Sequence, residues 1–205
     1  MEHVDQKSLV RQLDPAIEIE GLSQSTLGDF WSWGYSDVLV NTIRAVFGEF
    51  LIAHALGVAT KPRVDWDSVD LRYRSAGIEV KTTSAIQAWP HPANVKPSPP
   101  RFDIARHEKW DPRTGSYPSV QGRWADCYVF CVFVGPTCRP ISPEELRIAV
   151  LNTNYWLFHV APTSEIDELG DQKSIGLSSL AKLWPSMGYE DLRTAIEAAL
   201  KANGA

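Results

Sequence analysis

Two acidic residues and a lysine lie close together in a segment where polar and apolar residues alternate. Asp70 is followed by Glu79 and Lys81, and the residues between them predict two short strands joined by a turn. Two carboxylates held a few ångströms apart can ligate a divalent cation, and an ammonium beside them can contact a phosphate oxygen or an attacking water. These residue types therefore suit a metal-assisted reaction on a substrate that carries phosphate.

The predicted hairpin covers residues 69–82, with the turn at 75–77. Apolar residues on paired strands must share one face, so the charged residues share the other. The expected pairs are Leu71 with Val80, Tyr73 with Ile78, Asp70 with Lys81, and Arg72 with Glu79. The alternative without chemistry is a solvent face that carries two ordinary cross-strand ion pairs.

Glu49 supplies a third carboxylate from a predicted helix that begins after Ser36-Asp37 and ends at Gly57. Its neighbours one turn away on either side are apolar or small. A carboxylate in such a stripe is costly unless it is paired or coordinates a metal. The alternative is a glutamate at the helix edge that extends into water.

The remaining pattern predicts the elements that would hold these residues. Apolar runs at 126–134 and 155–160 predict buried strands, and an amphipathic stretch at 189–201 predicts a last helix. Residues 1–25 are expected to form an N-terminal arm, and the 205 residues suit a single domain, 1–205. His91, His107 and His159 are candidates for general acid or base chemistry, although none has the spacing of metal ligands. His159 lies in the second apolar run, where a core role is expected.

A proline-rich stretch from 89 to 123 predicts a long loop with short elements. Residues 61–147 hold 13 Lys and Arg against 10 Asp and Glu, although the whole chain has a net charge of −5. An anionic partner would therefore bind the middle of the chain. The loop residues expected to line the approach are Lys96, Arg101, Arg106, Lys109 and Arg113, with His107 a further candidate for phosphate contact. The alternative is a solvated basic loop.

No segment is apolar enough for a signal peptide or a membrane span, and the longest apolar run is 127–135. Three cysteines without a matching metal-binding pair favour reduced thiols. We expect a cytoplasmic protein that does not contact a membrane.

The sequence resembles the PD-(D/E)XK nuclease superfamily, which includes type II restriction enzymes and archaeal Holliday-junction resolvases. The resemblance rests on Asp70, on Ile78-Glu79-Val80-Lys81, on the preceding Glu49, and on the Gln87-Ala88-Trp89 continuation. It extends over most of the chain from about residue 26, towards an uncharacterised bacterial group. Val69 takes the place of the proline in the family name.

The resemblance implies an α/β fold with a restriction-endonuclease-like αβββαβ core, in which helices flank a central mixed sheet. It implies a Mg²⁺-dependent nuclease, with Mn²⁺ as a substitute, that acts on nucleic acid and on DNA in the first place as an endonuclease. A homodimer is compatible with it. By the same resemblance, the metal ligands are Asp70, Glu79 and the Val80 carbonyl, Glu49 completes the site directly or through water, and Lys81 orients the nucleophile. Gln87 is expected to contact the substrate. Arg101 and Arg106 are expected to contact it because of the positive charge of their loop.

Two alternatives of other classes remain open at this stage. One is a catalytically silent nucleic-acid-binding or interaction module on the same fold. The other is a Mg²⁺-dependent enzyme for another class of substrate.

Overall fold

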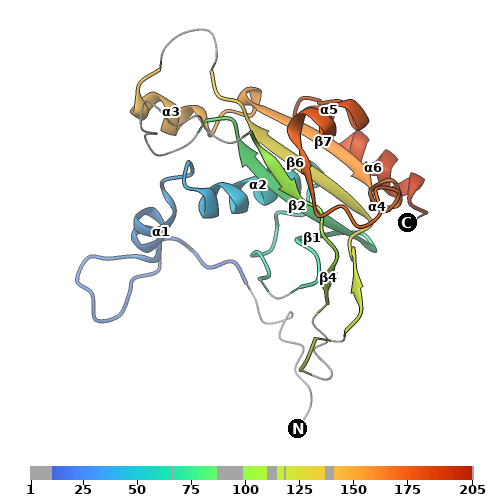
Figure 1. Cartoon of the computed structure of the whole chain (residues 1–205). Coiled ribbons are helices and arrows are strands. Elements are labelled where there is room, and N and C mark those ends of the chain that lie inside the picture. Colours follow the sequence, from blue (N-terminus) through green and yellow to red (C-terminus); the bar gives the residue numbers. More distant parts are fainter. Residues whose placement is uncertain are drawn as a thin grey trace.

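A four-stranded mixed sheet organises the computed structural model, which describes residues 11–65, 67–86, 99–109, 115–117, 119–136 and 141–204 (Figure 1). Its strand order is β1-β2-β6-β7. β1 and β2 are antiparallel, β2 and β6 are parallel, and β6 and β7 are antiparallel. The strands are β1 (Leu71–Tyr73), β2 (Ala76–Ser84), β6 (Cys127–Phe133) and β7 (Trp156–Pro162). The expected α/β class is confirmed at this level.

The two apolar runs form the buried strands β6 and β7, as predicted; β6 is an inner strand of the sheet and β7 lies at its edge. All seven residues of β6 are buried, because the strand is covered on both faces and has a neighbour on each side. β7 exposes only Leu157. β-Branched and aromatic side chains suit such a position, since they pack well on both faces of a pleated sheet.

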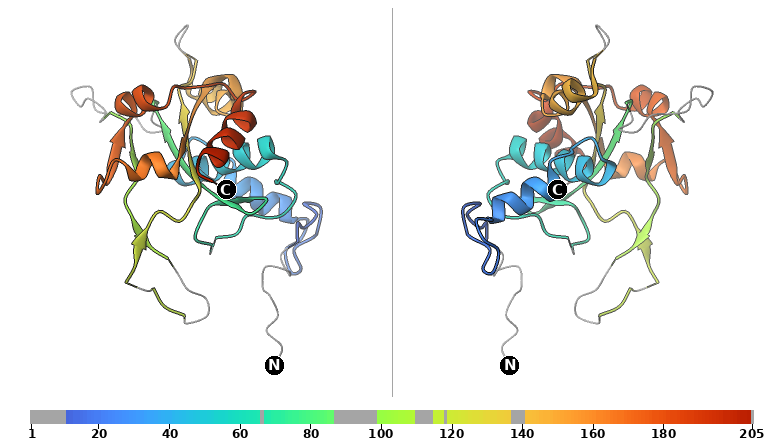
Figure 2. Two further views of the ribbon diagram at one scale, coloured as in Figure 1. Left: turned by 90° about the vertical axis from the view of Figure 1, so that its right-hand side faces the viewer. Right: turned by 90° about the vertical axis from the view of Figure 1, so that its left-hand side faces the viewer.

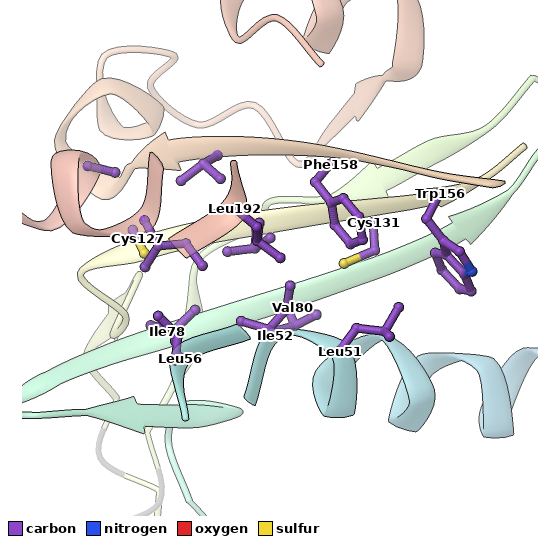
Figure 3. Close-up of a cluster of buried hydrophobic side chains, with 14 of the residues drawn as sticks. Leu51, Ile52, Leu56, Ile78, Val80, Cys127, Cys131, Trp156, Phe158 and Leu192 are labelled. Carbon is purple, nitrogen blue, oxygen red and sulfur yellow. The ribbon is translucent and has the colours of Figure 1, made fainter. Parts of the chain in front are cut away.

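Helices α2 (Asn41–Leu56) and α6 (Leu192–Ala202) cover one face of the sheet. Figure 3 shows Leu51, Ile52 and Leu56 of α2 against Ile78 and Val80 of β2. α2 ends where the sequence predicts, because Gly57 adopts a left-handed conformation with φ 74° and its N–H caps the last turn.

The second face of the sheet packs on a smaller layer. Phe102, Ile175 and Leu180 lie there against Tyr128 and Phe130. Figure 2 shows α4 and α5 on the side of the sheet away from α2. The elements of this layer are β3 (Arg101–Asp103), which pairs with β8 (Ser174–Gly176), α4 (Thr163–Asp167) and α5 (Leu177–Leu183).

The predicted hairpin exists, but its register differs by two residues. Leu71 pairs with Ile78 and Tyr73 with Ala76, so the turn is Arg74-Ser75 and the expected pairs were wrong. Gly77 belongs to the strand, where a Cβ would collide with Val69. A two-residue turn matches the twist of a hairpin better, and Arg74 accepts the positive φ of 56° that it requires. A shift of two keeps every side chain on its predicted face.

The N-terminal part holds a helix that the sequence analysis missed. α1 (Leu27–Tyr35) begins with a capping box in which Thr26 and Asp29 bond reciprocally. Residues 11–25, the described part of the expected arm, contain no helix. The predicted start of α2 at Ser36-Asp37 was wrong, because that helix begins at Asn41.

The proline-rich region contains a short ribbon of β4 (His107–Glu108) and β5 (Gln121–Gly122). Figure 2 shows this ribbon extending from the domain on the side away from α1. Between β6 and β7 lie α3 (Pro143–Ala149) and the 3₁₀ turn η2 (Thr153–Tyr155). Within the described ranges, no helix has the length and apolar character needed to cross a bilayer.

Candidate active site

The candidate site lies along one edge of β2. β1 is only three residues long and its pairing ends at Ile78, so among the described residues no strand covers this side of β2 from Glu79 onward. We call residues 79–84 on this side the open edge. Asp70 precedes β1 and takes the place of a strand partner, because its Oδ2 accepts the Val80 N–H at 2.7 Å. The Val80 carbonyl points to the same side as its N–H.

Glu79 and Lys81 lie on the sheet face opposite α2, beside Tyr128 and Phe130 of β6. Their side chains are 20% and 25% exposed, and Lys81 Nζ lies 2.6 Å from Glu79 Oε1. The expected cross-strand partners were wrong: Lys81 pairs with Glu79 on its own strand, and Arg72 pairs with Asp67 at 2.8 Å. The Glu79–Lys81 ion pair places a cation and an anion together at the open edge.

The charges around this pair shift both pKa values upward. Burial raises the pKa of Glu79, Asp70 adds to the effect, and Lys81 offsets part of it. Burial lowers the pKa of Lys81, but Glu79, Asp70 and Asp103 together raise it above its ordinary value. Lys81 therefore remains protonated at neutral pH, and it can donate and neutralise but cannot serve as a base.

Glu49 reaches the same edge from α2 because the helix approaches β2 closely. A Cβ at Gly48 would collide with Thr82 Oγ1, so only glycine allows this approach. The Glu49 side chain is 8% exposed and is bound by Arg63, with Nε to Oε2 at 2.5 Å and Nη2 to Oε1 at 2.9 Å. The interpretation of Glu49 as a glutamate that reaches water was wrong.

The three carboxylates influence one another electrostatically. Burial raises the pKa of Glu49, the bond from Arg63 lowers it, and the charges of Asp70 and Glu79 raise it again. The donor set consists of carboxylates and a backbone carbonyl, the hard oxygen ligands that Mg²⁺ and Mn²⁺ accept. In the part of the chain that the structure describes, no three His, Cys, Asp or Glu side chains are gathered closely enough to hold a metal ion. The carboxylates are instead bonded within the protein: Glu49 to Arg63, Asp70 to the Val80 N–H, and Glu79 to Lys81.

The predicted substrate residues lie in different places. Arg101 donates to Ser174 Oγ at 2.8 Å across the β3–β8 pair, and Arg106 lies 3.2 Å from Asp171. Both hold the second layer together, and their contact with substrate stays a prediction. Lys109 lies over the Trp124 ring, at 5.5 Å from its centroid. The remaining predicted contacts, Gln87, Lys96 and Arg113, lie outside the described residues.

Two of the candidate histidines lie among the described residues, in different surroundings. His159 is 1% exposed, and its Nδ1 lies 2.6 Å from the Trp184 carbonyl, as a satisfied core histidine should. His107 Nε2 lies 3.3 Å from Asp103 Oδ2, near the Glu79–Lys81 pair. His91 falls outside the described residues.

Arg63, Asp103 and Trp124 are neighbours of the site that were not predicted from the sequence. Arg63 lies in an irregular segment, and nothing local to it indicates that it binds Glu49. A weak sequence signal could have indicated Asp103. It directly follows the apolar Phe102, so in a short strand its side chain lies on the face opposite to that buried residue.

Comparisons with protein-family models, with curated proteins and with solved structures found no match to this chain.

Proposed function

We propose that this protein is a metal-dependent nuclease that hydrolyses phosphodiester bonds within DNA. The observation that carries the proposal is the open edge of β2, where Asp70 is bonded to the backbone of Val80 between Glu79 and Lys81. Glu49 is directed to the same edge by the close packing of Gly48 on Thr82.

The order of the elements supports the finer fold that the resemblance implies. α2, β1, β2, β6, α3 and β7 follow one another in the αβββαβ order, and α2 packs against the sheet that contains the hairpin. In the described part of the chain, four additional short strands (β3, β4, β5 and β8) and helices α1, α4, α5 and α6 surround this core. We propose a restriction-endonuclease-like core on this basis.

The residues that would hold Mg²⁺ or Mn²⁺ are Asp70, Glu79, the Val80 carbonyl and Glu49. Their accumulated negative charge favours a cation, since burial and mutual repulsion already raise the pKa values of Glu49 and Glu79. When bound, such an ion supplies a water of lowered pKa and offsets charge on the phosphate.

The chain's own residues supply the rest of the chemistry. Lys81 presents a protonated amine held in place by Glu79, so it can orient a water or a phosphate oxygen without first losing a proton. A fixed cation beside the developing negative charge lowers the barrier more than it tightens binding of the ground state.

A cleavage assay tests this proposal. Supercoiled, linear, single-stranded and branched DNA are incubated with the protein, with and without Mg²⁺ or Mn²⁺. The variant is Lys81→Ala, and the matched control is Lys182→Ala, an exposed lysine of α5. We expect metal-dependent cleavage that Lys81→Ala lowers by about 10²–10³-fold, as for loss of a transition-state donor, with little change in DNA affinity.

One result would overturn the proposal in favour of a silent binding module. In that result the wild type binds DNA, cleaves none of the forms with either metal, and Lys81→Ala binds equally well. The ion pairs of Glu49 and Glu79 would then be structural.

A further inference from the structure

A cavity of about 310 Å³ opens beside Glu79 at the base of the β4–β5 ribbon. This volume is at the lower end of the range for small-molecule sites and suits one flat ring system with a short attachment. Aromatic, acidic and basic side chains line it, among them Trp124, Tyr128, Asp65, Asp67, Glu79 and Lys109.

Trp124 is fixed in this cavity as a flat platform. Its indole N–H donates to the His107 carbonyl at 2.8 Å, which ties the ring to β4. One part of the ring packs on Gly122 of β5, where a Cβ would come within 3.2 Å of it. The residue is still 36% exposed, and the Lys109 ammonium lies above the ring. The ribbon therefore holds the indole and leaves part of it open to a ligand.

The lining of the cavity carries more carboxylates than cationic side chains. Asp65 and Asp67 are held by Arg63 and Arg72, and Glu79 is held by Lys81, so the lining is acidic but largely paired. Carboxylates repel an anion and accept hydrogen bonds from amino groups. A neutral nucleobase, with a π face for Trp124 and amino groups for the acids, fits this lining better than a phosphate does.

We propose that this cavity takes one unpaired nucleobase of the strand whose phosphate lies at the open edge. The inference rests on the proposed function, and it names the substrate class as single-stranded or locally unpaired DNA. In a continuous duplex the bases are stacked and paired, and extruding one costs several kcal/mol. Duplex DNA should therefore bind less tightly than DNA with an exposed base.

Binding is measured by fluorescence anisotropy in Ca²⁺, which is used in place of Mg²⁺ so that binding is read without cleavage. The probes are a single strand, a fully paired duplex, and the same duplex with one unpaired base. The variants are Trp124→Ala and Trp124→Phe, and the control is Trp33→Ala, a tryptophan of α1 that is 85% exposed.

The wild type should prefer the two probes with unpaired bases. Trp124→Ala should weaken binding to those probes about tenfold, as expected for loss of one stacked base, and leave duplex binding unchanged. Trp124→Phe keeps a stacking face and should stay within about threefold of the wild type, while Trp33→Ala should not alter the preference.

Equal binding of all three probes by the wild type, or an equal loss on all probes in Trp124→Ala, overturns the inference. If Trp124→Ala does not fold, the inference is tested by Trp124→Phe alone. A tenfold loss of affinity for the probes with unpaired bases in that variant contradicts stacking. A preference that depends on Trp124, found together with no cleavage in either Mg²⁺ or Mn²⁺, supports the inference and overturns the nuclease proposal alone.

Discussion

Strand β6 and the open edge of β2 are neighbouring parts of one sheet, but the first is apolar and buried and the second is charged and partly exposed. Every residue of β6 is buried, and its polar backbone is paired on both sides. The open edge carries Glu79 and Lys81, and its backbone partner is the Asp70 side chain. Apolar burial stabilises the first region, whereas the second holds like charges close together at a cost in stability. This difference is what the proposed nuclease site at the open edge requires.

The largest effect should come from opening a cavity in the interior. Phe133 is fully buried and packs on Trp156 with ring centroids 5.4 Å apart. Phe133→Ala should lower the free energy of unfolding by about 3–5 kcal/mol. Thr83→Ala, on the open edge, should cost at most about 1 kcal/mol. Urea unfolding of both variants measures the contrast, and equal losses would contradict it.

The next effect concerns the contact that brings α2 to the edge. Gly48→Ala should cost about 1–3 kcal/mol, because its Cβ collides with Thr82. In a Thr82→Ala background the same substitution should cost clearly less, since the Oγ1 that collides is gone and only the Cβ contact at 3.3 Å remains, while alanine is the better helix former. A double-mutant cycle by urea unfolding measures this coupling. Additive effects would show that Gly48 does not set the approach of α2.

A smaller effect should appear in the pH dependence of the free energy of unfolding, through Glu79 at the open edge. Burial, followed by the charge of Asp70, raises the pKa of Glu79 above its ordinary value of 4.5. The native state then holds this proton more tightly, so the stabilising contribution is present below pH 4.5 and is lost as pH rises through the folded pKa. Glu79→Gln should flatten this fall in the free energy of unfolding, and the control Glu190→Gln should leave it unchanged. The free energy is measured by urea unfolding at a series of pH values. Parallel pH profiles of Glu79→Gln and the wild type would contradict the prediction.

The interior should respond to pH with the opposite sign. Burial lowers the pKa of His159 below 6.5, although its bond to the Trp184 carbonyl offsets part of the shift. The unfolded chain therefore takes up a proton first, and stability falls as pH decreases from 6.5 towards the folded pKa. His159→Gln should remove this loss in the same unfolding series. A steeper loss in the variant would refute a neutral core imidazole.

The fold was largely predictable where the signal is local. The parity of the hairpin placed Ile78 and Val80 in the core, and Gly57 marked the end of α2. The register was wrong because Gly77 was assigned to the turn, whereas it leaves room for Val69. α1 was missed although Thr26 and Asp29 form a capping box, because the helix buries no residue and so lacks a clear apolar face.

The candidate site was predictable for its expected carboxylates and Lys81, but not for the residues that contact them. Asp70, Glu79 and Lys81 follow from the spacing along two adjacent strands. The bond from Arg63 to Glu49 and the position of Trp124 beside Glu79 depend on how distant segments pack, and no local pattern encodes them.

Mn²⁺ binding followed by electron paramagnetic resonance tests the central claim most directly, because it reports the cation at the carboxylates without any substrate. The wild type should bind Mn²⁺ saturably, and Mg²⁺ should compete. Asp70→Asn should weaken the binding at least about tenfold, since it removes an anionic ligand of a hard cation, while Glu190→Asn should have no effect. Equal Mn²⁺ binding by the wild type and Asp70→Asn, or none by either, would contradict a metal site at the open edge.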